Sequence, residues 1–274
     1  VTRHVALIGK PLKRRHSQVM HDAAFDACGI DARYVLQEIE ADEVEGVVAA
    51  ARGSDWLGLG VTAPYKQVVA GLVDEVEGDA QAIGAVNNVV RTDGGRLIGF
   101  NSDAPGFRAA VELAMGRSLA GAEVVVVGAG GAAQAVAHAC LASGVRRLTV
   151  GNRTLPVSAA GIPAIALDAP TFLAALASAD LAVNATTVGM VDPGMTIPVE
   201  RLPDHATVFD LVYVPRETPL LAAARGRGLR AANGSEMLIQ QAAIAFERWT
   251  GVGGMADVMR DAVAPLLADP TVTA

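Results

Sequence analysis

The stretch from residue 124 to residue 145, VVVVGAGGAAQAVAHACLASGV, decides how the fold is interpreted. It contains no Asp, Glu, Lys or Arg and is about as long as a helix that spans a bilayer. However, four valines are followed by a glycine cluster and then by an alanine-rich segment that contains Gln134 and His138. This order is typical of a strand, a tight turn and a buried helix. We therefore expect a strand–turn–helix unit of a globular α/β protein here, and no membrane helix.

The glycine cluster matches the pattern G-x-G-x-x-A at Gly128, Gly130 and Ala133. Glycines let the backbone turn tightly and approach a pyrophosphate, which then binds to amide groups at the N-terminus of the following helix. The same pattern also occurs where a helix simply packs on a strand, but the strand before it and the helix after it favour a dinucleotide site. The residues expected to contact the dinucleotide are Gly128, Ala129, Gly130, Gly131 and Ala132.

The end of the next expected strand indicates which dinucleotide binds. An NAD site usually places Asp or Glu there, about 20 residues beyond the glycines, to bind the ribose hydroxyl. Here the strand ends in Asn152, Arg153 and Thr154, and an arginine fits a 2′-phosphate through its charge and its planar fork of donors. We expect NADP as the cofactor, with NAD still possible because Val157 supplies no second positive charge. The alternative is that Arg153 is an ordinary solvated loop residue.

The rest of the chain alternates between apolar segments typical of strands and amphipathic segments typical of helices. Before residue 105, strands are expected at 4–9, 32–39 and 56–62, helices at 17–28 and 42–52, and a hairpin at 91–100. A helix from about Pro105 to Met115 leads to a second series of strands at 123–128, 147–152, 180–186 and 207–213. Two amphipathic helices, 235–251 and 255–268, end the pattern.

This alternation predicts the fold class α/β with two open α/β domains. The second is expected to be a Rossmann-type dinucleotide-binding domain over residues 105–234. The first is expected over residues 1–104. The C-terminal helices, residues 235–274, are expected to return to the first domain and complete it.

Composition and charge exclude several classes of protein. The net charge is −7 and the only basic cluster is the triplet Lys13, Arg14, Arg15, so nucleic-acid binding is not expected. The two cysteines, Cys28 and Cys140, match neither a zinc spacing nor a disulfide framework. We interpret both as core thiols in a reducing cytoplasm. The apolar run at 5–9 is too short for a signal peptide, so export is not expected.

Two charged residues fall where ligands bind in open α/β sheets, beyond the carboxyl ends of the strands. Lys66 ends the stretch VTAPYK (61–66), which resembles the end of a buried strand, and Asp103 ends GFNSD (99–103). A lysine with an ordinary pKa near 10.4 transfers protons poorly at neutral pH unless burial lowers that pKa. The residues alone therefore leave two interpretations equally open, a catalytic pair and a structural salt bridge.

Several segments together resemble the shikimate dehydrogenase family, in the same order and over nearly the whole chain. They are VTAPYK (61–66), GAVNN (84–88), FNSD (100–103), GAGGA (128–132), NRT (152–154), NAT (184–186), Tyr213 with the following TPLL, and NGSEMLIQQA (233–242). The resemblance implies an NADP-linked oxidoreductase that interconverts 3-dehydroshikimate and shikimate, a step of aromatic amino acid biosynthesis. It also implies that the first domain, residues 1–104, binds a small-molecule substrate and carries the catalytic groups, with neither a nucleic acid nor a membrane as partner. The oligomeric state is left open, with a homodimer as one alternative.

The same resemblance assigns roles to individual residues. Lys66 and Asp103 match the catalytic pair, in which Lys66 exchanges a proton with the substrate oxygen while hydride moves. The positions that match substrate-binding residues are Ser17, Thr62, Asn87, Tyr213 and Gln241. Gly234 matches a position near the nicotinamide, and Leu211 is a further expected cofactor-binding residue. No metal ligand is implied.

The chain departs from the family pattern in its first loop, where two serines usually bind the substrate carboxylate. Here Ser17 is kept and the first serine is replaced by Arg15. Arg15 could bind a carboxylate through two hydrogen bonds, fill the pocket and change which acid fits, or face solvent. A zinc site made of His16, His21 and Asp22 lacks a third histidine and is disfavoured. The alternatives to a shikimate dehydrogenase are a paralogue for quinate, an amino analogue or another cyclic hydroxy acid, and a non-catalytic dinucleotide sensor.

Overall fold

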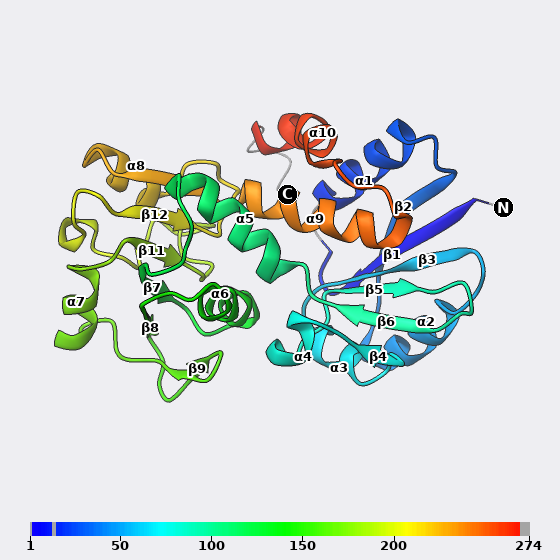
Figure 1. Cartoon of the computed structure of the whole chain (residues 1–274), viewed down its shortest axis with the longest axis horizontal. Helices are drawn as coiled ribbons and strands as arrows, with labels where there is room; N and C mark the ends of the chain where they lie inside the picture. The colour runs from blue at the N-terminus through cyan, green and yellow to red at the C-terminus, as the bar shows by residue number, and fades with distance from the viewer. Residues whose placement is uncertain (1, 13–14, 269–274) are drawn as a thin grey trace. The chain divides into compact units, whose positions relative to one another are not determined.

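The computed structural model describes residues 2–12 and 15–268, and within them the chain forms two compact units. The first unit combines the chain up to Ser102 with the chain from Ile239 onward, and the second runs from Asp103 to Leu238. In Figure 1 the first unit is coloured blue to cyan for its N-terminal part and orange to red for its C-terminal part, and the second unit is green to yellow. Lys13 and Arg14 of the basic triplet lie outside the described residues.

The first unit is built on a six-stranded mixed sheet with the order β2-β1-β3-β5-β6-β4. Its strands are β1 (Arg3–Gly9), β2 (Ala32–Glu38), β3 (Trp56–Val61), β4 (Glu75–Val76), β5 (Asn88–Arg91) and β6 (Leu97–Phe100). Strands β2, β1 and β3 are parallel, and β5 runs antiparallel to both β3 and β6. The expected hairpin is thus confirmed as the pair β5 and β6, which adds antiparallel strands to a parallel half.

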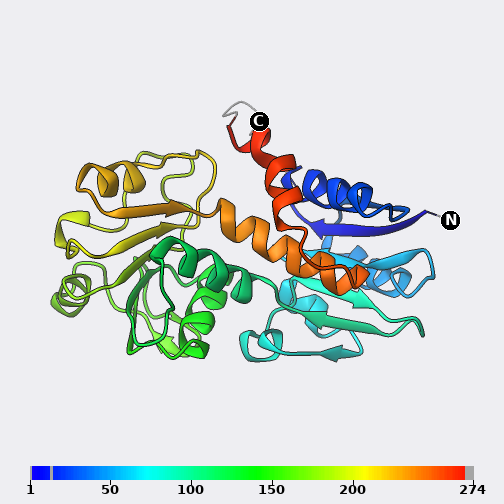
Figure 2. The same cartoon turned by 45° about the horizontal axis from the view of Figure 1, so that its top comes forward.

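Helices cover this sheet, and two of them come from the C-terminal part of the chain. The helices are α1 (His16–Ala27), α2 (Val44–Ala50), α3 (Lys66–Ala70), α4 (Asp79–Ile83), α9 (Ser235–Thr250), whose residues from Ile239 belong to this unit, and α10 (Ala256–Ala268). Helix α10 packs along α1, as Figures 1 and 2 both show. The Trp249 indole on α9 donates a hydrogen bond to the Val89 carbonyl at 2.9 Å. A Cβ atom at Gly58 would lie 2.8 Å from the Trp249 nitrogen, so this glycine allows α9 to approach the sheet closely.

The second unit is built on a fully parallel five-stranded sheet with the order β13-β12-β11-β7-β8. Its strands are β7 (Glu123–Val127), β8 (Arg147–Gly151), β11 (Leu181–Asn184), β12 (Thr207–Asp210) and β13 (Arg230–Asn233); a small hairpin joins β9 (Ser158–Ala159) to β10 (Ile162–Pro163). The valines of β7 are at most 1% exposed, as expected for an interior strand of a sheet covered on both faces. The helices are α5 (Asp103–Met115), α6 (Gly131–Ala142), α7 (Pro170–Leu176) and α8 (Pro219–Gly226).

This sheet order places a topological switch point between β7 and β11, because the chain moves from β7 outward to β8 and then returns to the other side at β11. Ligands of open α/β sheets bind at such a point, beyond the carboxyl ends of the strands. The α/β fold class with a Rossmann-type second unit is therefore confirmed. Among residues 2–12 and 15–268, no helix is both long and apolar enough to cross a bilayer.

Three expectations about local structure were wrong. Strand β3 ends at Val61, and a turn carries the chain to Lys66, which begins helix α3 instead of ending a strand. Strand β12 ends at Asp210, so Tyr213 lies in the following loop. Cys140 is buried as expected, but Cys28 is only half-buried, with its Sγ atom 3.4 Å from Met255 Sδ.

Candidate active site

The turn that carries Thr62 and Lys66 is held to the sheet by hydrogen bonds on both sides. The Thr62 amide donates to the Ile8 carbonyl at 2.9 Å, and the buried Tyr65 hydroxyl donates to the Ile39 carbonyl at 2.7 Å. A Cβ atom at Gly9 would lie 2.3 Å from Thr62 Cγ2, so glycine at the end of β1 leaves the space that Thr62 occupies. Thr62 and the half-buried Lys66 thus lie on a fixed turn beyond the carboxyl end of β3.

Asn87 lies beside this turn, immediately before β5, and belongs to a buried polar cluster. Its carbonyl accepts a hydrogen bond from the Val61 amide at 2.8 Å, and its side chain bonds Ser102. Ser102 also donates to Gln241 Oε1 on α9 at 3.3 Å. The structure therefore brings the expected substrate residues Asn87 and Gln241 to one serine, although they are far apart in the sequence.

Arg15 and Ser17 lie at the N-terminal end of α1. Arg15 is exposed, and its Nε atom donates to Gln18 Oε1 at 3.3 Å, one turn further along the helix. Ser17 is half-buried in the first turn. The nearby His21 is buried against the rings of Tyr34 and Trp249, at centroid distances of 4.5 Å and 5.1 Å.

Asp22, the carboxylate of the disfavoured zinc set, accepts a hydrogen bond from the Tyr34 amide at 2.8 Å. Within the described ranges 2–12 and 15–268, no three or more His, Cys, Asp or Glu side chains are grouped so that they could hold a metal ion.

In the second unit, the glycine cluster forms the turn between β7 and α6, at the switch point. Gly128 has φ +120, and a Cβ atom there would lie 2.8 Å from the Ala185 carbonyl oxygen at the end of β11. Gly130 caps α6, and Gly130 and Gly131 are exposed, with nothing within 4 Å of a Cβ atom at either position. Ala133, by contrast, is fully buried.

The glycines of this motif fall into two kinds, one required by the protein's own packing and one that leaves space for a ligand. Gly128 is required by a backbone conformation and a close contact inside the protein, whereas Gly130 and Gly131 leave open space beside the amide groups that begin α6. Ala129 is half-buried and Ala132 is exposed on the first turn of α6. Open space in front of free helical amides is what a pyrophosphate needs, so the turn fits the expected dinucleotide.

Asn152, Arg153 and Thr154 follow β8, which pairs with β7, so they lie at the same edge of the sheet as the glycine turn. The Asn152 side chain donates to the Thr154 carbonyl at 2.8 Å and holds the loop in a tight turn. Arg153 is exposed, and its side chain makes no hydrogen bond or ion pair with any residue in 2–12 or 15–268. Its charge is therefore available to an anion.

The carboxyl ends of β11 and β12 carry a buried polar network that the sequence analysis did not identify. Asn184 Nδ2 donates to Asp210 Oδ1 at 2.8 Å, and the Thr218 hydroxyl donates to Asp210 Oδ2 at 2.7 Å. The Val212 amide also donates to Asp210, at 3.0 Å. Burial raises the pKa of Asp210, and these hydrogen bonds oppose the rise. The network fixes the loop that contains Leu211 and the half-buried Tyr213.

Leu211 and Gly234 are neighbours in space. A Cβ atom at Gly234 would lie 2.2 Å from the Leu211 carbonyl oxygen, so no larger residue fits there without a shift of the backbone. These two expected cofactor-binding residues are therefore brought together just beyond the ends of β12 and β13. Lys66 belongs to the first unit and Asp103, the first residue of α5, to the second.

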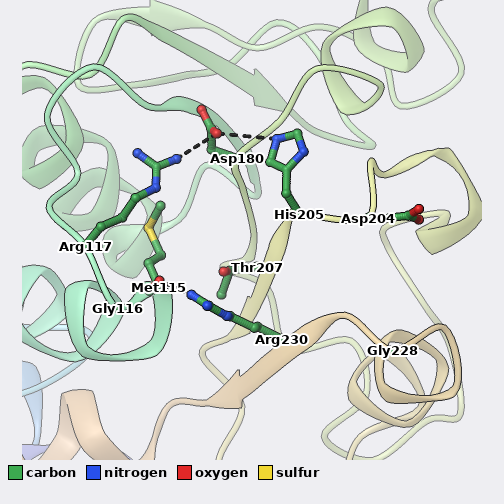
Figure 3. Close-up of a pocket in the computed structure, with 9 residues that line it drawn as sticks. All are labelled: Met115, Gly116, Arg117, Asp180, Asp204, His205, Thr207, Gly228 and Arg230. Carbon is green, nitrogen blue, oxygen red and sulfur yellow. Dashed lines mark hydrogen bonds and ion pairs between the residues drawn. The ribbon is translucent and has the colours of Figure 1, made fainter.

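A pocket of about 610 Å³ lies at the opposite edge of this sheet, where the strands begin (Figure 3). It includes Thr207 and Arg230, the first residues of β12 and β13, and none of the expected site residues. Its arginines already have partners, because Arg117 pairs with Asp180 at 2.7 Å and Arg230 donates to the Met115 carbonyl. These contacts tie loops and the end of α5 to the sheet, so we assign the pocket no part in the dinucleotide site.

Buried polar residues at strand ends were left without a role by the sequence analysis, among them the four residues Ser102, Asn88, Asn184 and Asp210. Three of them stand in the quoted segments GAVNN, FNSD and NAT. Polar side chains beside apolar strands were the available signal, since a buried polar group needs a partner.

Comparisons with known proteins cover nearly the whole chain. The model of the shikimate dehydrogenase substrate binding domain matches residues 7–89, and that of the shikimate 5′-dehydrogenase C-terminal domain matches residues 234–264. The chain is 40% identical to the shikimate dehydrogenase (NADP(+)) of Symbiobacterium thermophilum, covering 97% of this chain and 95% of the relative.

Solved structures agree over the same length. The shikimate 5-dehydrogenase of Thermus thermophilus, solved with NADP(H) and shikimate, has a TM-score of 0.85 and 35% identity, covering 96% of this chain and 99% of the other. The quinate dehydrogenase of Corynebacterium glutamicum, solved with NAD, has a TM-score of 0.86 and 33% identity, covering 96% and 99%. With the glycine turn at the switch point and matches at this level from end to end, the chain belongs to the shikimate dehydrogenase family.

Proposed function

We propose that this chain is an NADP-dependent oxidoreductase that interconverts 3-dehydroshikimate and shikimate. Its relative in Symbiobacterium thermophilum is a shikimate dehydrogenase (NADP(+)) and is similar over 97% of this chain. We further propose that the first unit, completed by the C-terminal helices, binds the acid and that the second unit binds the nucleotide. The match of residues 7–89 to a substrate-binding domain and the glycine turn of the second unit support this division.

The nucleotide would be held by the turn from Gly128 to Ala132 and by Arg153. The open space at Gly130 and Gly131 fits a pyrophosphate, and the available charge of Arg153 fits a 2′-phosphate. Leu211 and Gly234 would line the nicotinamide end, while Asn152 and Thr154 shape the loop around Arg153. When bound, the nicotinamide supplies the hydride acceptor or donor.

The remaining chemistry falls to side chains of the protein. Lys66 would take the proton of the substrate hydroxyl when the carbon is oxidised, and would return it to the ketone oxygen in reduction. Asp103 would orient that hydroxyl. The groups proposed to bind the acid are Ser17, Thr62, Asn87, Tyr213 and Gln241.

The observation that carries this proposal is the glycine turn at the β7–β11 switch point in a chain that resembles shikimate dehydrogenases from end to end. The test is a steady-state screen of shikimate, quinate and related cyclic hydroxy acids, each with NADP and with NAD. We expect the highest kcat/KM for shikimate with NADP. Absence of turnover with every acid would instead support a dinucleotide-binding sensor.

A paralogue with another acid as substrate is the second candidate, and Arg15 favours it. A guanidinium at the start of α1 offers a carboxylate two charge-assisted hydrogen bonds, worth roughly 1.5 to 3 kcal/mol. The similar fold of a quinate dehydrogenase shows that this architecture also occurs in an enzyme named for a different acid.

The variant Arg15→Ser separates these roles of Arg15. If Arg15 binds the carboxylate equally in ground and transition states, KM for the best acid should rise by about ten- to a hundredfold at similar kcat. If Arg15 instead blocks a shikimate-sized pocket, the variant should turn over shikimate faster. Unchanged constants for both acids would assign Arg15 to solvent, where its contact with Gln18 already directs part of the side chain.

A cytoplasmic location is proposed because both cysteines are free thiols, which suits a reducing compartment. Fractionation of the source cells would test it. The homodimer stays a prediction, and sedimentation velocity at micromolar concentration would distinguish it from a monomer.

A further inference from the structure

Ser102 is the centre of a hydrogen-bond cluster that joins three separate segments of the first unit. It is fully buried, and its neighbours Asn87 and Asn88 are 5% and 4% exposed. Its Oγ atom accepts from Asn88 Nδ2 at 2.8 Å and from Asn87 Nδ2 at 3.2 Å. The same atom donates to Gln241 Oε1 at 3.3 Å. The end of β6, the start of β5 and helix α9 therefore meet at one hydroxyl.

These contacts use the full bonding capacity of the serine. A hydroxyl has one proton to donate and two lone pairs to accept with. The hydroxyl donates its proton to Gln241, and its two lone pairs accept hydrogen bonds from the side chains of Asn87 and Asn88. Ser102 has no group left for a ligand, so its influence on a substrate acts through its partners.

The cluster also fixes which way the Asn87 amide faces. Asn87 Oδ1 accepts from Asn88 Nδ2 at 2.8 Å and from the Ser102 backbone amide at 2.8 Å, which fills both lone pairs. Its Nδ2 atom gives one proton to Ser102 and keeps a second. A flipped amide would place NH₂ against two donors and break this pattern, so Asn87 can present only an N–H group to a ligand.

Gln241 turns its amide oxygen toward Ser102 and accepts the proton of the serine hydroxyl. Amide donors are complementary to oxygen acceptors, which are the carboxylate, the ketone and the hydroxyl lone pairs of a cyclic hydroxy acid.

We propose that Ser102 is a positioning residue that fixes the amide of Asn87 so that it meets the substrate as a hydrogen-bond donor, with Gln241 accepting the proton of the serine. This inference rests on the proposed function, because it assumes that the bound molecule is the acid. Asn88 is assigned a supporting role, since it fills lone pairs on both Asn87 and Ser102 and so removes the alternative amide orientation.

The kinetic test compares Ser102→Ala with Ser102→Thr, which keeps a hydroxyl. We expect Ser102→Ala to raise the substrate KM about tenfold, the scale of one hydrogen bond, while KM for NADP changes less than about twofold. Ser102→Thr should recover most of the loss. The matched control is Thr250→Ala on α9, which removes a hydroxyl that bonds the Phe246 carbonyl at 2.8 Å and should leave both KM values unchanged.

An unchanged substrate KM in a folded Ser102→Ala protein would overturn the inference. So would an equal rise in both KM values, because that would indicate a general loss of structure. A parent protein that turns over no acid at all would refute the proposed function, and the cluster would then be tested separately, without a substrate.

That separate test uses nitrogen-15 NMR of the parent protein with no ligand added. The side-chain NH₂ protons of Asn87 and Asn88 should exchange slowly with solvent, because they are bonded in a buried cluster. This measurement needs no variant, so it remains decisive if Ser102→Ala does not fold. Rapid exchange of both amides would show that Ser102 does not hold them.

Discussion

Lys66 begins α3 on a turn whose backbone is fixed at Thr62 and Tyr65. If it is the proton-transfer group, Lys66→Ala should lower kcat by roughly a hundredfold or more, while the dissociation constant for NADP stays nearly the same. Steady-state kinetics and fluorescence titration measure the two quantities. Lys10→Ala is the control, because Lys10 is an exposed lysine paired with Glu40. Equal turnover in Lys66→Ala and the parent would return Lys66 to a structural role.

Arg153 is the residue that should set the choice between the two dinucleotides. Only the 2′-phosphate distinguishes NADP from NAD, so Arg153→Ala should raise KM for NADP by about tenfold and leave KM for NAD almost unchanged. Arg146→Ala is the control, because Arg146 pairs with Glu123 where β7 begins, at the other edge of the sheet. A parent with higher kcat/KM for NAD than for NADP would contradict the assignment.

Single residues were predicted to different degrees. Sequence pattern alone identified Gly128, Gly130 and Arg153 as dinucleotide-site residues. Their function follows from the residue type itself, since only glycine lacks a side chain and arginine always carries a positive charge. It could not select Ser102, whose role depends on Gln241, a residue 139 positions further along the chain. Contacts of that range are set by tertiary packing, which local spacing does not encode.

At the scale of one element, the turn from β7 into α6 contains two kinds of glycine that a pair of variants would separate. Gly128→Ala should destabilise the protein by roughly 1–3 kcal/mol, because it places a Cβ atom against the Ala185 backbone at a positive φ. Gly130→Ala meets open space at φ −77, so stability should hold while KM for NADP rises. Urea unfolding and kinetics of both variants measure the contrast. An equal loss of stability in the two variants would contradict the open space beside Gly130.

Whole elements were predicted where their sequence was long and patterned. The buried valines predicted β7, and the amphipathic tail predicted α9 and α10. Strand β13, with the sequence RAAN, contains no β-branched or aromatic residue and exists because it pairs with β12. Helix α3 covers only KQVVA and follows the turn at Pro64, so a strand that continued to Lys66 was the natural but wrong reading of VTAPYK.

At the scale of the whole molecule, the fully buried His21 should make the protein sensitive to acid. Burial lowers its pKa to about 3, compared with about 6.5 in an unfolded chain. The unfolded state therefore binds the extra proton first, so stability is complete above about pH 6.5 and is lost as the pH falls toward 3.

The variant His21→Phe keeps a ring between Tyr34 and Trp249 and removes this titration. Its free energy of unfolding should depend less steeply on pH between 6.5 and 3, by up to about 1.4 kcal/mol per pH unit. Urea unfolding at pH 7, 5 and 4 gives both slopes. Identical slopes would show that His21 gains its proton without unfolding.

The first unit is discontinuous, since its sheet is finished by helices that follow the entire second unit in sequence. A ribosome delivers the chain from its N-terminus, and domains generally fold as they emerge. The second unit, a continuous segment, can fold while synthesis is still under way. The first unit cannot be completed until Trp249 has been translated. Until then the Val89 carbonyl and the sheet surface at Gly58 remain uncovered. The segment synthesised first is therefore completed last, and the nascent chain has the greatest need of a chaperone during that interval.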